Sequence, residues 1–250
     1  MVKISVITAV YNRVGTVAGA VMSVRRQSYA AVEHVVVDGA SSDGTAALLN
    51  SMADERAHDM QFLSEPDGGI YDALNKGFAL SSGEVIGLMH SDDFFADDYV
   101  LEHVMDAFKD PSVDAVYGDL DYVDKDDSSR VVRHWQSGPF HRSRLSWGWM
   151  PPHPALFLRR RVIEQWGGYD TSYRIAADYD AILRYFSKEG FRAAYIPRVL
   201  VKMRVGGESN RSIGKILLKS GEDYRALKKS GVGGLGVLAC KNLVKIGQFF

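Results

Sequence analysis

The stretch that decides the fold is VIGLMHSDDFF, residues 85–95, in which an apolar run ends on two adjacent aspartates, Asp92 and Asp93. The apolar part is typical of a buried strand. Ser91 or Asp92 could cap the helix expected over residues 97–108, but a cap needs one acid and not two. At the carboxyl end of a strand, carboxylates can instead hold Mg²⁺ or Mn²⁺ against phosphates, because open α/β sheets bind their ligands at that edge. The pair alone does not decide between these interpretations.

The first half of the chain alternates short β-branched runs with helix-like segments. The expected strands cover residues 3–10, 33–39, 60–65 and 84–91, and the expected helices cover residues 16–27, 43–53 and 69–81. Strands that alternate with helices of this length indicate right-handed crossovers and a mainly parallel sheet that is covered on both faces. The sequence therefore predicts an α/β fold.

Polar residues follow four successive strands of this predicted sheet. Thr8, Tyr11 and Asn12 lie at the end of the first strand, Asp38 at the end of the second, Glu65 and Asp67 after the third, and Asp92 and Asp93 after the fourth. Because the carboxyl ends of parallel strands lie at one edge, we expect these side chains to converge. Structural turns alone would not need acids at each of these ends, so the pattern favours a ligand site.

After about residue 112 the pattern changes to that of a mixed or antiparallel sheet. Strands are expected over residues 113–123, 129–137, 191–197 and 199–205, with a short apolar strand within residues 150–160 and a helix over residues 178–190. The helix is opened by Asp178 and Asp180 and closed by Gly190.

Composition sets limits on the class of protein. The 250 residues are 46% hydrophobic, which is enough for one large domain, or for one domain with a small appendage. The single cysteine, Cys240, excludes an internal disulfide framework and argues against a structural zinc site. The amino terminus lacks the features of a secretion signal, and no apolar run reaches the roughly 18 residues that a spanning helix needs. We therefore expect a cytoplasmic protein.

The formal net charge of −1 conceals a basic carboxyl-terminal part. Residues 198–250 contain 11 Lys/Arg and 3 Asp/Glu, a net of +8, which leaves −9 for residues 1–197. Near the end, apolar residues alternate with lysines in the pattern of an amphipathic surface helix: Leu235, Leu238, Leu243, Val244, Ile246, Phe249 and Phe250. Such a helix could contact an anionic membrane surface, or it could dock onto its own domain or onto a dimer partner.

Two residues at the first strand ends have a structural and a functional interpretation. Asp38 could be an ordinary turn residue, or it could accept a hydrogen bond from the imide N–H of a uracil or thymine ring. The functional interpretation is favoured for Asp38. Tyr11 could stack on that ring, and both interpretations stay open for it.

Four residues of the second half also have two interpretations. Asp178 could interact with the helix dipole, or it could act as a general base that deprotonates a hydroxyl. On composition alone, His153 is a loop or packing residue rather than a catalyst. Trp147 and Trp149 could belong to the core or could provide a platform for a sugar ring, because the apolar faces of sugars stack on aromatic rings.

Five ordered motifs together resemble the family 2 glycosyltransferases with a GT-A fold. They are TAVYN (8–12), VVVDGASSDGT (35–45), SEPDGGIYDALNKG (64–77), HSDD (90–93) and AADYD (176–180). The resemblance covers roughly residues 3–205 and implies a Rossmann-like, mostly parallel central sheet, a mixed acceptor-side portion and carboxyl-terminal helices. It also implies a catalytic domain over residues 1–205, with a nucleotide-sugar-binding half (1–112) and an acceptor-binding half (113–205), followed by a basic helical extension (206–250).

The activity implied by the resemblance is inverting transfer of a sugar from a nucleotide diphosphate donor to an acceptor hydroxyl. A UDP-sugar is favoured by Asp38. The implied acceptor is a lipid-linked saccharide in bacterial surface polysaccharide synthesis, handled at the inner face of the cell membrane through peripheral contact of the carboxyl-terminal region. A homodimer is compatible with the sequence, and no nucleic-acid partner is expected.

The site residues implied by the resemblance follow the positions of the motifs. Asp178 would be the catalytic base, and Asp93 would be the direct ligand of Mg²⁺ or Mn²⁺. The donor nucleotide would contact Thr8, Tyr11, Asn12, Asp38, Asp67, Asn75, Lys76, Asp92 and Arg204, and the acceptor would contact Trp149 and His153. Relatives often have Glu-Asp where this chain has Ala177-Asp178, so a neighbouring acid that could contact the acceptor is missing.

Two other functions compete with this one. A sugar-phosphate nucleotidyltransferase would be expected to carry a glycine- and arginine-rich loop with a lysine directly after the first strand, and AVYNRVGT (9–16) supplies it poorly. A non-catalytic nucleotide-sugar-binding or scaffold protein would share the fold. The presence of Asp93 and Asp178 argues against the scaffold.

Overall fold

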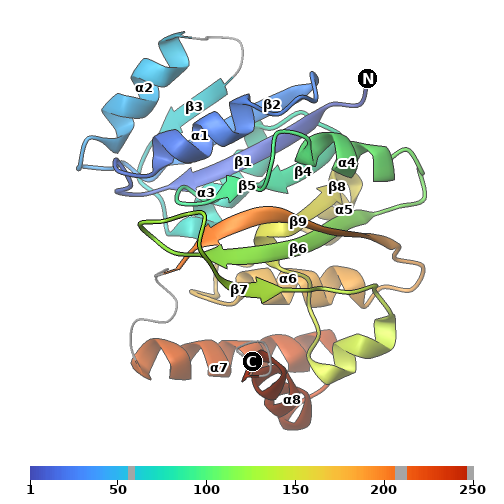
Figure 1. The fold of residues 1–250 in the computed structure, drawn as a ribbon. Helices are drawn as coiled ribbons and strands as arrows, with labels where there is room; N and C mark the ends of the chain where they lie inside the picture. Colours follow the sequence, from blue (N-terminus) through green and yellow to red (C-terminus); the bar gives the residue numbers. More distant parts are fainter. Residues whose placement is uncertain (56–59, 206–212, 247–250) are drawn as a thin grey trace.

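Helices cover both faces of a central sheet, so the structure has three layers (Figure 1). The computed structural model describes residues 1–55, 60–205 and 213–246. The strands are β1 (Ile4–Val10), β2 (Val32–Asp38), β3 (Met60–Ser64), β4 (Val85–Leu88), β5 (Phe94–Phe95), β6 (Ala115–Val123), β7 (Val131–Trp135), β8 (Leu156–Arg159) and β9 (Ala193–Arg204). Over the described residues they form one sheet in the order β3-β2-β1-β4-β8-β6-β9-β5, with β7 paired to β6. The α/β architecture predicted from the sequence is confirmed.

The amino-terminal half of the sheet is parallel, as predicted. β1 pairs with β2 and with β4, and β2 pairs with β3. All seven residues of β1 are buried, since helices cover both faces, and this explains its near-continuous apolar sequence. The carboxyl ends of the four strands consequently lie at one edge.

The other half of the sheet is mixed. β8 runs antiparallel to both β4 and β6, and β9 runs parallel to β6. The prediction of two separate strands over residues 191–197 and 199–205 is wrong, because β9 continues through Pro197. The register between β6 and β9 shifts at Gly118, where a side chain would lie 2.8 Å from the carbonyl oxygen of Arg198. An irregularity of this kind tolerates a residue without an N–H donor.

The helices divide between the two faces of the sheet. One face is covered by α1 (Val17–Arg25), α2 (Thr45–Glu55) and α4 (Val100–Ala107). The other face is covered by α3 (Ile70–Leu80), α5 (Arg160–Trp166) and α6 (Ala177–Phe186). Two short 3₁₀ turns, η1 (Arg142–Trp147) and η2 (His153–Ala155), lie between β7 and β8.

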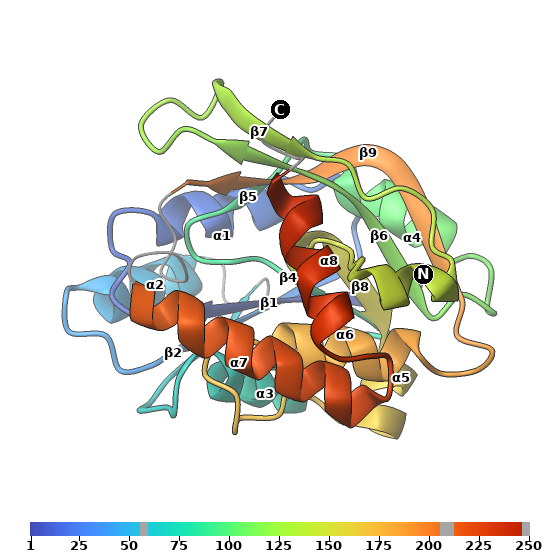
Figure 2. The ribbon, with the colours of Figure 1, turned by 90° about the horizontal axis from the view of Figure 1, so that it is seen from below.

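Two carboxyl-terminal helices, α7 (Ile213–Ser230) and α8 (Leu235–Ile246), pack outside α6 (Figure 2). Ala226 and Leu227 of α7 are fully buried and belong to the same apolar core as α6. Phe249 and Phe250 of the predicted amphipathic segment lie outside the described residues. Within the part of the chain that is described, no helix is both long and apolar enough to cross a membrane.

Candidate active site

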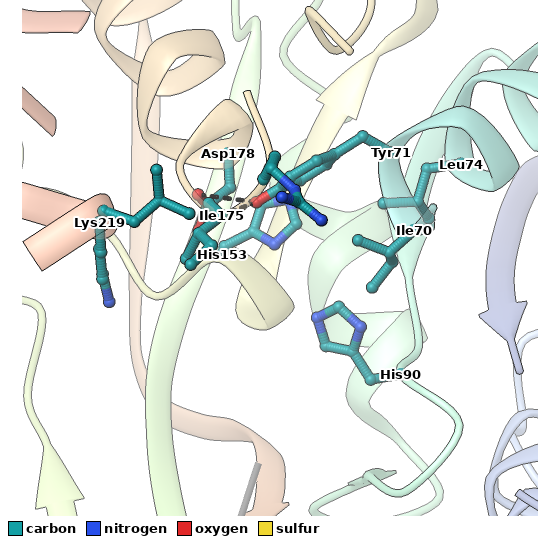
Figure 3. A pocket seen from close by; sticks show the side chains of 10 residues that line it. Ile70, Tyr71, Leu74, His90, His153, Ile175, Asp178 and Lys219 are labelled. Atoms are coloured by element: carbon teal, nitrogen blue, oxygen red, sulfur yellow. Dashed lines mark hydrogen bonds between the residues drawn. The ribbon is translucent and has the colours of Figure 1, made fainter. Parts of the chain in front are cut away.

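Two adjacent cavities open at the edge where the parallel strands end. The strand-end cavity, of about 790 Å³, is lined by residues that include Tyr11, Asn12, Arg13, Gly39, Asp67 and Ser91. The aspartate cavity, of about 510 Å³, is lined by residues that include Tyr71, His90, His153, Arg174, Asp178 and Lys219 (Figure 3). Ile70 lines both cavities, and the consecutive residues His90 and Ser91 line one each. The cavities therefore meet at the amino end of α3.

The loop after β1 forms one wall of the strand-end cavity. The backbone N–H of Asn12 donates to Oγ of Ser41 (2.8 Å), and Oδ1 of Asn12 accepts from the N–H of Ser42 (2.9 Å). Asn12 has a φ of 51°, a left-handed conformation that asparagine tolerates better than most residues. These contacts hold Tyr11 with 60% of its surface exposed at the cavity. The loop thus brings together the two predicted donor-binding residues, Tyr11 and Asn12.

Thr8 and Asp38 lie below the cavity rather than on its surface. Both are fully buried. Oγ1 of Thr8 is 2.9 Å from Nε2 of His34, and the carboxylate of Asp38 accepts hydrogen bonds from the backbone N–H and hydroxyl of Ser41 and from the hydroxyl of Ser64. Asp38 therefore connects the loops after β2 and β3. For Thr8 and Asp38, this geometry gives no support to the expected direct contact with a nucleotide base.

Asp67 reaches the cavity because Gly39 has no side chain. A Cβ on Gly39 would lie only 2.5 Å from Oδ2 of Asp67. The other carboxylate oxygen, Oδ1, accepts a hydrogen bond from the N–H of Gly69 (2.8 Å). Asp67 is therefore the carboxylate that the structure places in the strand-end cavity.

Asn75 and Lys76, two further predicted donor-binding residues, fix neighbouring segments instead of lining a cavity. Asn75 exchanges two hydrogen bonds with the backbone of Tyr169 (2.8 and 2.9 Å). Nζ of Lys76 lies 2.8 Å from Oε1 of Glu65 and 2.9 Å from the carbonyl oxygen of Pro66. The ion pair with Glu65 raises the pKa of Lys76.

The paired acids after β4 contact the end of β9. Asp93 is only 1% exposed, and its Oδ1 accepts a hydrogen bond from the N–H of Arg204 (3.2 Å). The guanidinium of Arg204 donates to the carbonyl oxygen of Asp92 and lies over the ring of Phe94 at 4.8 Å. Burial raises the pKa of Asp93 well above its usual range, and the neighbouring charge of Asp92 adds to this rise. Two predicted residues far apart in sequence, Asp93 and Arg204, are thus in direct contact.

By their chemistry, Asp92 and Asp93 suit a divalent cation that a substrate helps to coordinate, and they follow directly on His90 and Ser91, which line the two cavities, without lining either cavity themselves. No group of three or more His, Cys, Asp or Glu residues suited to a metal occurs in the described ranges. Mg²⁺ is commonly held by one or two carboxylates together with substrate phosphates and water, so two acids suffice. A cation would also offset the repulsion between two neighbouring carboxylates, one of which is buried.

Asp178 lies in the first turn of α6 and faces the aspartate cavity (Figure 3). Its Oδ1 accepts hydrogen bonds from the N–H of Tyr179 (2.8 Å) and from the hydroxyl of Tyr71 (3.3 Å). The same hydroxyl donates to the carbonyl oxygen of Ile175 at 2.6 Å. The carboxylate is half-buried, is held by these two hydrogen bonds and opens onto a cavity. A general base requires such an arrangement.

Two histidines share the aspartate cavity with Asp178. The rings of His90 and His153 are 5.9 Å apart, and Nε2 of His153 lies 2.6 Å from the hydroxyl of Tyr169. Burial lowers the pKa of His153 to about 4, although the charge of Asp178 acts in the opposite direction. Burial also lowers the pKa of His90. Both rings are consequently neutral near pH 7.

Trp149, expected as an acceptor contact, is part of the core. Its ring packs against Tyr117, Phe140 and Phe186, and its Nε1 donates to the carbonyl oxygen of Ser137 (2.8 Å). The position of Trp149 matches its interpretation as a core residue. Trp147 is 68% exposed.

Two cations of the aspartate cavity come from segments without a recognisable motif. Arg174 precedes α6, and Lys219 belongs to α7. Among the described residues, neither side chain has an ion-pair or hydrogen-bond partner. Both side chains add positive charge to the lining of the cavity.

Sequence reasoning also missed Arg13, Ile70 and Tyr71. Ile70 and Tyr71 lie inside the quoted motif SEPDGGIYDALNKG, where their position at the start of α3, just after a strand end, was an available signal. No signal marked Arg174 or Lys219, because they reach the cavity only through the packing of α7 against α6.

Comparison with known families gives a match over much of the chain. Residues 5–167 match the family model described as glycosyl transferase family 2. This range contains all the residues named above for the strand-end cavity.

Two curated relatives have a similar extent. An uncharacterized glycosyltransferase of Mycobacterium tuberculosis (strain CDC 1551 / Oshkosh) is 36% identical over 185 residues, which cover 72% of this chain and 68% of that protein. A PGL/p-HBAD biosynthesis glycosyltransferase of Mycobacterium bovis (strain BCG / Pasteur 1173P2) is 31% identical over 219 residues, which cover 86% of this chain and 82% of that protein.

A solved structure has a similar fold. The mannosyltransferase PcManGT from Pyrobaculum calidifontis, in complex with GDP-Man and Mn²⁺, superimposes with a TM-score of 0.71 at 20% identity and covers 99% of this chain and 71% of that one. The similarity confirms the GT-A type of fold that the sequence motifs predicted.

Proposed function

Because the chain belongs to glycosyl transferase family 2 and is a transferase, we propose that it moves a sugar from a nucleotide diphosphate donor to an acceptor hydroxyl in one inverting displacement. The observation that carries this proposal is the junction of the two cavities at Ile70. A donor in the strand-end cavity and an acceptor in the aspartate cavity would meet there. Asp178 would then lie on the acceptor side of the reacting sugar carbon.

The donor is proposed to occupy the strand-end cavity. Tyr11 offers an exposed ring on which a base can stack, Asn12 and Asp67 offer hydrogen-bonding groups, and Arg13 offers a positive charge toward phosphates. The preference for uridine rested on Asp38, whose carboxylate is used by Ser41 and Ser64. The proposal is therefore a nucleoside diphosphate sugar, with the base to be chosen by experiment.

The divalent cation is proposed to bind at Asp92 and Asp93, with Asp93 as the direct ligand. Mg²⁺ or Mn²⁺ bound there supplies positive charge that stabilises the departing diphosphate. The chain itself keeps Arg204 beside this pair, because Arg204 contacts both Asp92 and Asp93.

Asp178 is proposed to remove the proton of the acceptor hydroxyl as that oxygen attacks. The hydrogen bond from Tyr71 orients the carboxylate, and His90 and His153, being neutral, do not compete as ion-pair partners. The C–O bond to the acceptor forms as the bond to the diphosphate breaks. Single displacement from the opposite face inverts the configuration without a covalent sugar–enzyme intermediate.

The acceptor is proposed to be a lipid-linked saccharide of surface polysaccharide synthesis. The positive charges of Arg174 and Lys219 suit an anionic linkage group next to the reacting sugar, and His153 suits a sugar hydroxyl. Ile216, Leu217 and Leu218 are 50%, 68% and 40% exposed on α7, and Leu218 also lines the aspartate cavity. We propose that this part of α7 rests on the inner membrane face and so brings the acceptor to the cavity.

A donor screen tests the proposal. Release of nucleoside diphosphate from UDP-, dTDP- and GDP-sugars is followed with Mg²⁺ or Mn²⁺ for wild type and for Asp178→Asn. We expect one donor to be turned over only with metal, and Asp178→Asn to lose at least about 100-fold in kcat while still binding that donor in calorimetry.

The matched control is Asp180→Asn in the same turn of α6. Asp180 is 3% exposed and pairs with Arg184 and Lys229, so its loss should lower thermal stability but leave turnover per folded molecule nearly unchanged. Donor binding without turnover by wild type, with and without lipid-linked acceptors, would instead indicate a non-catalytic nucleotide-sugar-binding protein.

A further inference from the structure

A buried glutamate of α7 binds the backbone directly before the proposed catalytic base. Oε1 of Glu222 accepts a hydrogen bond from the N–H of Arg174 (2.8 Å), and Oε2 accepts from the N–H groups of Ile175 and Ala176 (2.9 Å each). Glu222 is 7% exposed. Ala176 is the N-cap residue of α6 and provides no side-chain cap itself. The carboxylate therefore holds the backbone that leads into α6, and its charge lies near the amino end of that helix, where it interacts favourably with the helix dipole.

The segment held by Glu222 is part of the aspartate cavity. Arg174 and Ile175 line that cavity, and Asp178 follows Ala176 by two residues. The carbonyl oxygen of Ile175 accepts the hydrogen bond of Tyr71, whose hydroxyl also contacts Asp178. A displacement of residues 174–176 would thus move both the backbone before Asp178 and the tyrosine contact that orients it.

We propose that Glu222 is a positioning residue for Asp178, so that α7 sets the geometry of the general base as well as lining the cavity. This inference rests on the proposed function, in which Asp178 takes the acceptor proton. Glu222 touches neither substrate nor the reacting atoms in this arrangement. Its effect passes through the three backbone N–H groups that it accepts.

Other contacts also hold α7 in place, and they reach different residues from those that Glu222 contacts. Arg225 donates to Oγ of Ser172 (2.7 Å) and lies over the ring of Tyr173 at 3.6 Å. Lys229 lies 2.9 Å from Oδ2 of Asp170. These contacts reach residues 170–173 but not residues 174–176, so the positioning role and a general docking role can be separated by substitution.

The first variant is Glu222→Gln, which keeps the size of the side chain but replaces one accepting oxygen by an NH₂ donor. The control is Arg225→Gln, which weakens docking of α7 at the neighbouring residues. For both variants and wild type, we would measure amide hydrogen exchange, donor affinity by calorimetry, and kcat and KM with the donor found in the screen.

We expect faster exchange of the amides of residues 174–176 in Glu222→Gln, while the later amides of α6 stay protected. We expect kcat to fall about 10- to 100-fold with donor affinity unchanged, because a small misplacement of a catalytic group has effects of this size. Arg225→Gln should retain kcat.

Unchanged exchange at residues 174–176 in Glu222→Gln would overturn the proposal, even if no sugar transfer is ever observed. A fall in kcat that is equal in the two variants and follows their thermal stability would also overturn it, since Glu222 would then act only in docking. A wild-type protein that turns over no donor would instead refute the proposed function, and with it the role of Asp178 on which this inference rests.

Discussion

The hydroxyl of Tyr71 on α3 lies 3.3 Å from Oδ1 of Asp178 on α6, which connects the helix that borders both cavities to the proposed general base. The same hydroxyl lies 2.6 Å from the carbonyl oxygen of Ile175 and has a single proton to donate. Burial and the charge of Asp178 raise the pKa of Tyr71, so the hydroxyl remains protonated across the physiological range.

The first prediction concerns this contact. Tyr71→Phe should lower kcat about 10-fold, because Asp178 loses one of the two groups that orient it while the ring still packs against Tyr169. Donor affinity should not change. Steady-state kinetics and calorimetry check this. An unchanged kcat would mean that the hydroxyl only satisfies the carbonyl oxygen of Ile175.

The second prediction concerns the buried acid of the metal pair. Asp93→Asn should abolish metal-stimulated transfer and at the same time raise the melting temperature without metal, because it removes a buried charge beside Asp92. Each kcal/mol of stabilisation corresponds to about 2–4 °C in a chain of this size. Differential scanning calorimetry with and without Mn²⁺ measures the effect. Retention of metal-dependent transfer by Asp93→Asn would exclude Asp93 as the direct ligand.

The third prediction concerns membrane contact through α7. Leu217→Glu should weaken binding to vesicles that contain anionic lipid about 10-fold, since it replaces an apolar side chain that is 68% exposed by a negative charge. Tyr99→Glu, at a 58% exposed position on the loop before α4, is the control and should bind as wild type does. Equal binding by all three proteins in a vesicle co-sedimentation assay would refute the proposed contact.

The fourth prediction concerns a buried ion pair between the two carboxyl-terminal helices. Nζ of Lys241 lies 2.7 Å from Oδ2 of Asp223, with both side chains 3% exposed, and 3.2 Å from the ring centroid of Tyr179. Lys241→Ala should cost about 3–5 kcal/mol in urea unfolding, because it leaves a buried carboxylate unpaired.

Two comparisons test the origin of that cost. The double variant Lys241→Met/Asp223→Leu should recover most of the lost stability, since no unpaired charge is left. Lys109→Ala removes an ion pair whose side chains are 79% and 69% exposed, and it should cost far less stability than Lys241→Ala, because solvent screens an exposed pair. A double variant as unstable as Lys241→Ala would show that the missing packing, and not the unpaired charge, causes the loss.

The fifth prediction concerns acid stability. Burial lowers the pKa of His34 to about 3, and the charge of Arg25 contributes. Because the unfolded chain binds the proton near pH 6.5 and the folded chain only near pH 3, the contribution of His34 is fully present above pH 6.5 and is lost as the pH falls toward 3.

Substitution isolates this titration. His34→Gln keeps a hydrogen-bonding group near Oγ1 of Thr8 and should reduce the slope of unfolding free energy against pH in that window by at most about 1.4 kcal/mol per pH unit, which corresponds to one proton. His141→Gln at an exposed position is the control. A slope that His34→Gln leaves unchanged would contradict the assignment.

The parallel half of the fold could be predicted from the sequence because each strand is a short β-branched run that ends in polar residues. The local pattern of VVVDG, for example, contains both the strand and its end. β9 could not be predicted as one strand, because Pro197 interrupts the apolar pattern of the strand. The proline is tolerated there only because the pairing with β6 is irregular at Gly118.

The candidate site could be predicted in part for a similar reason. Tyr11, Asn12 and Asp67 line the strand-end cavity as expected from their places after β1 and β3. Position along a strand does not give the direction of a side chain or its partners, so the burial of Thr8 and Asp38 was not predictable.

The role of Glu222 depends on a contact across almost 50 residues, and no local pattern reports such a contact. The same limit applies to Arg174 and Lys219, which line the aspartate cavity only because α7 packs beside α6.

The residues that line the two cavities come from different parts of the chain. The residues that line the strand-end cavity are complete at Ser91, whereas the aspartate cavity needs Lys219 and its backbone support needs Glu222. On the ribosome, the residues of the strand-end cavity are therefore synthesised well before α7, which the aspartate cavity requires. A nascent chain would therefore complete the lining of the proposed donor cavity before that of the proposed acceptor cavity.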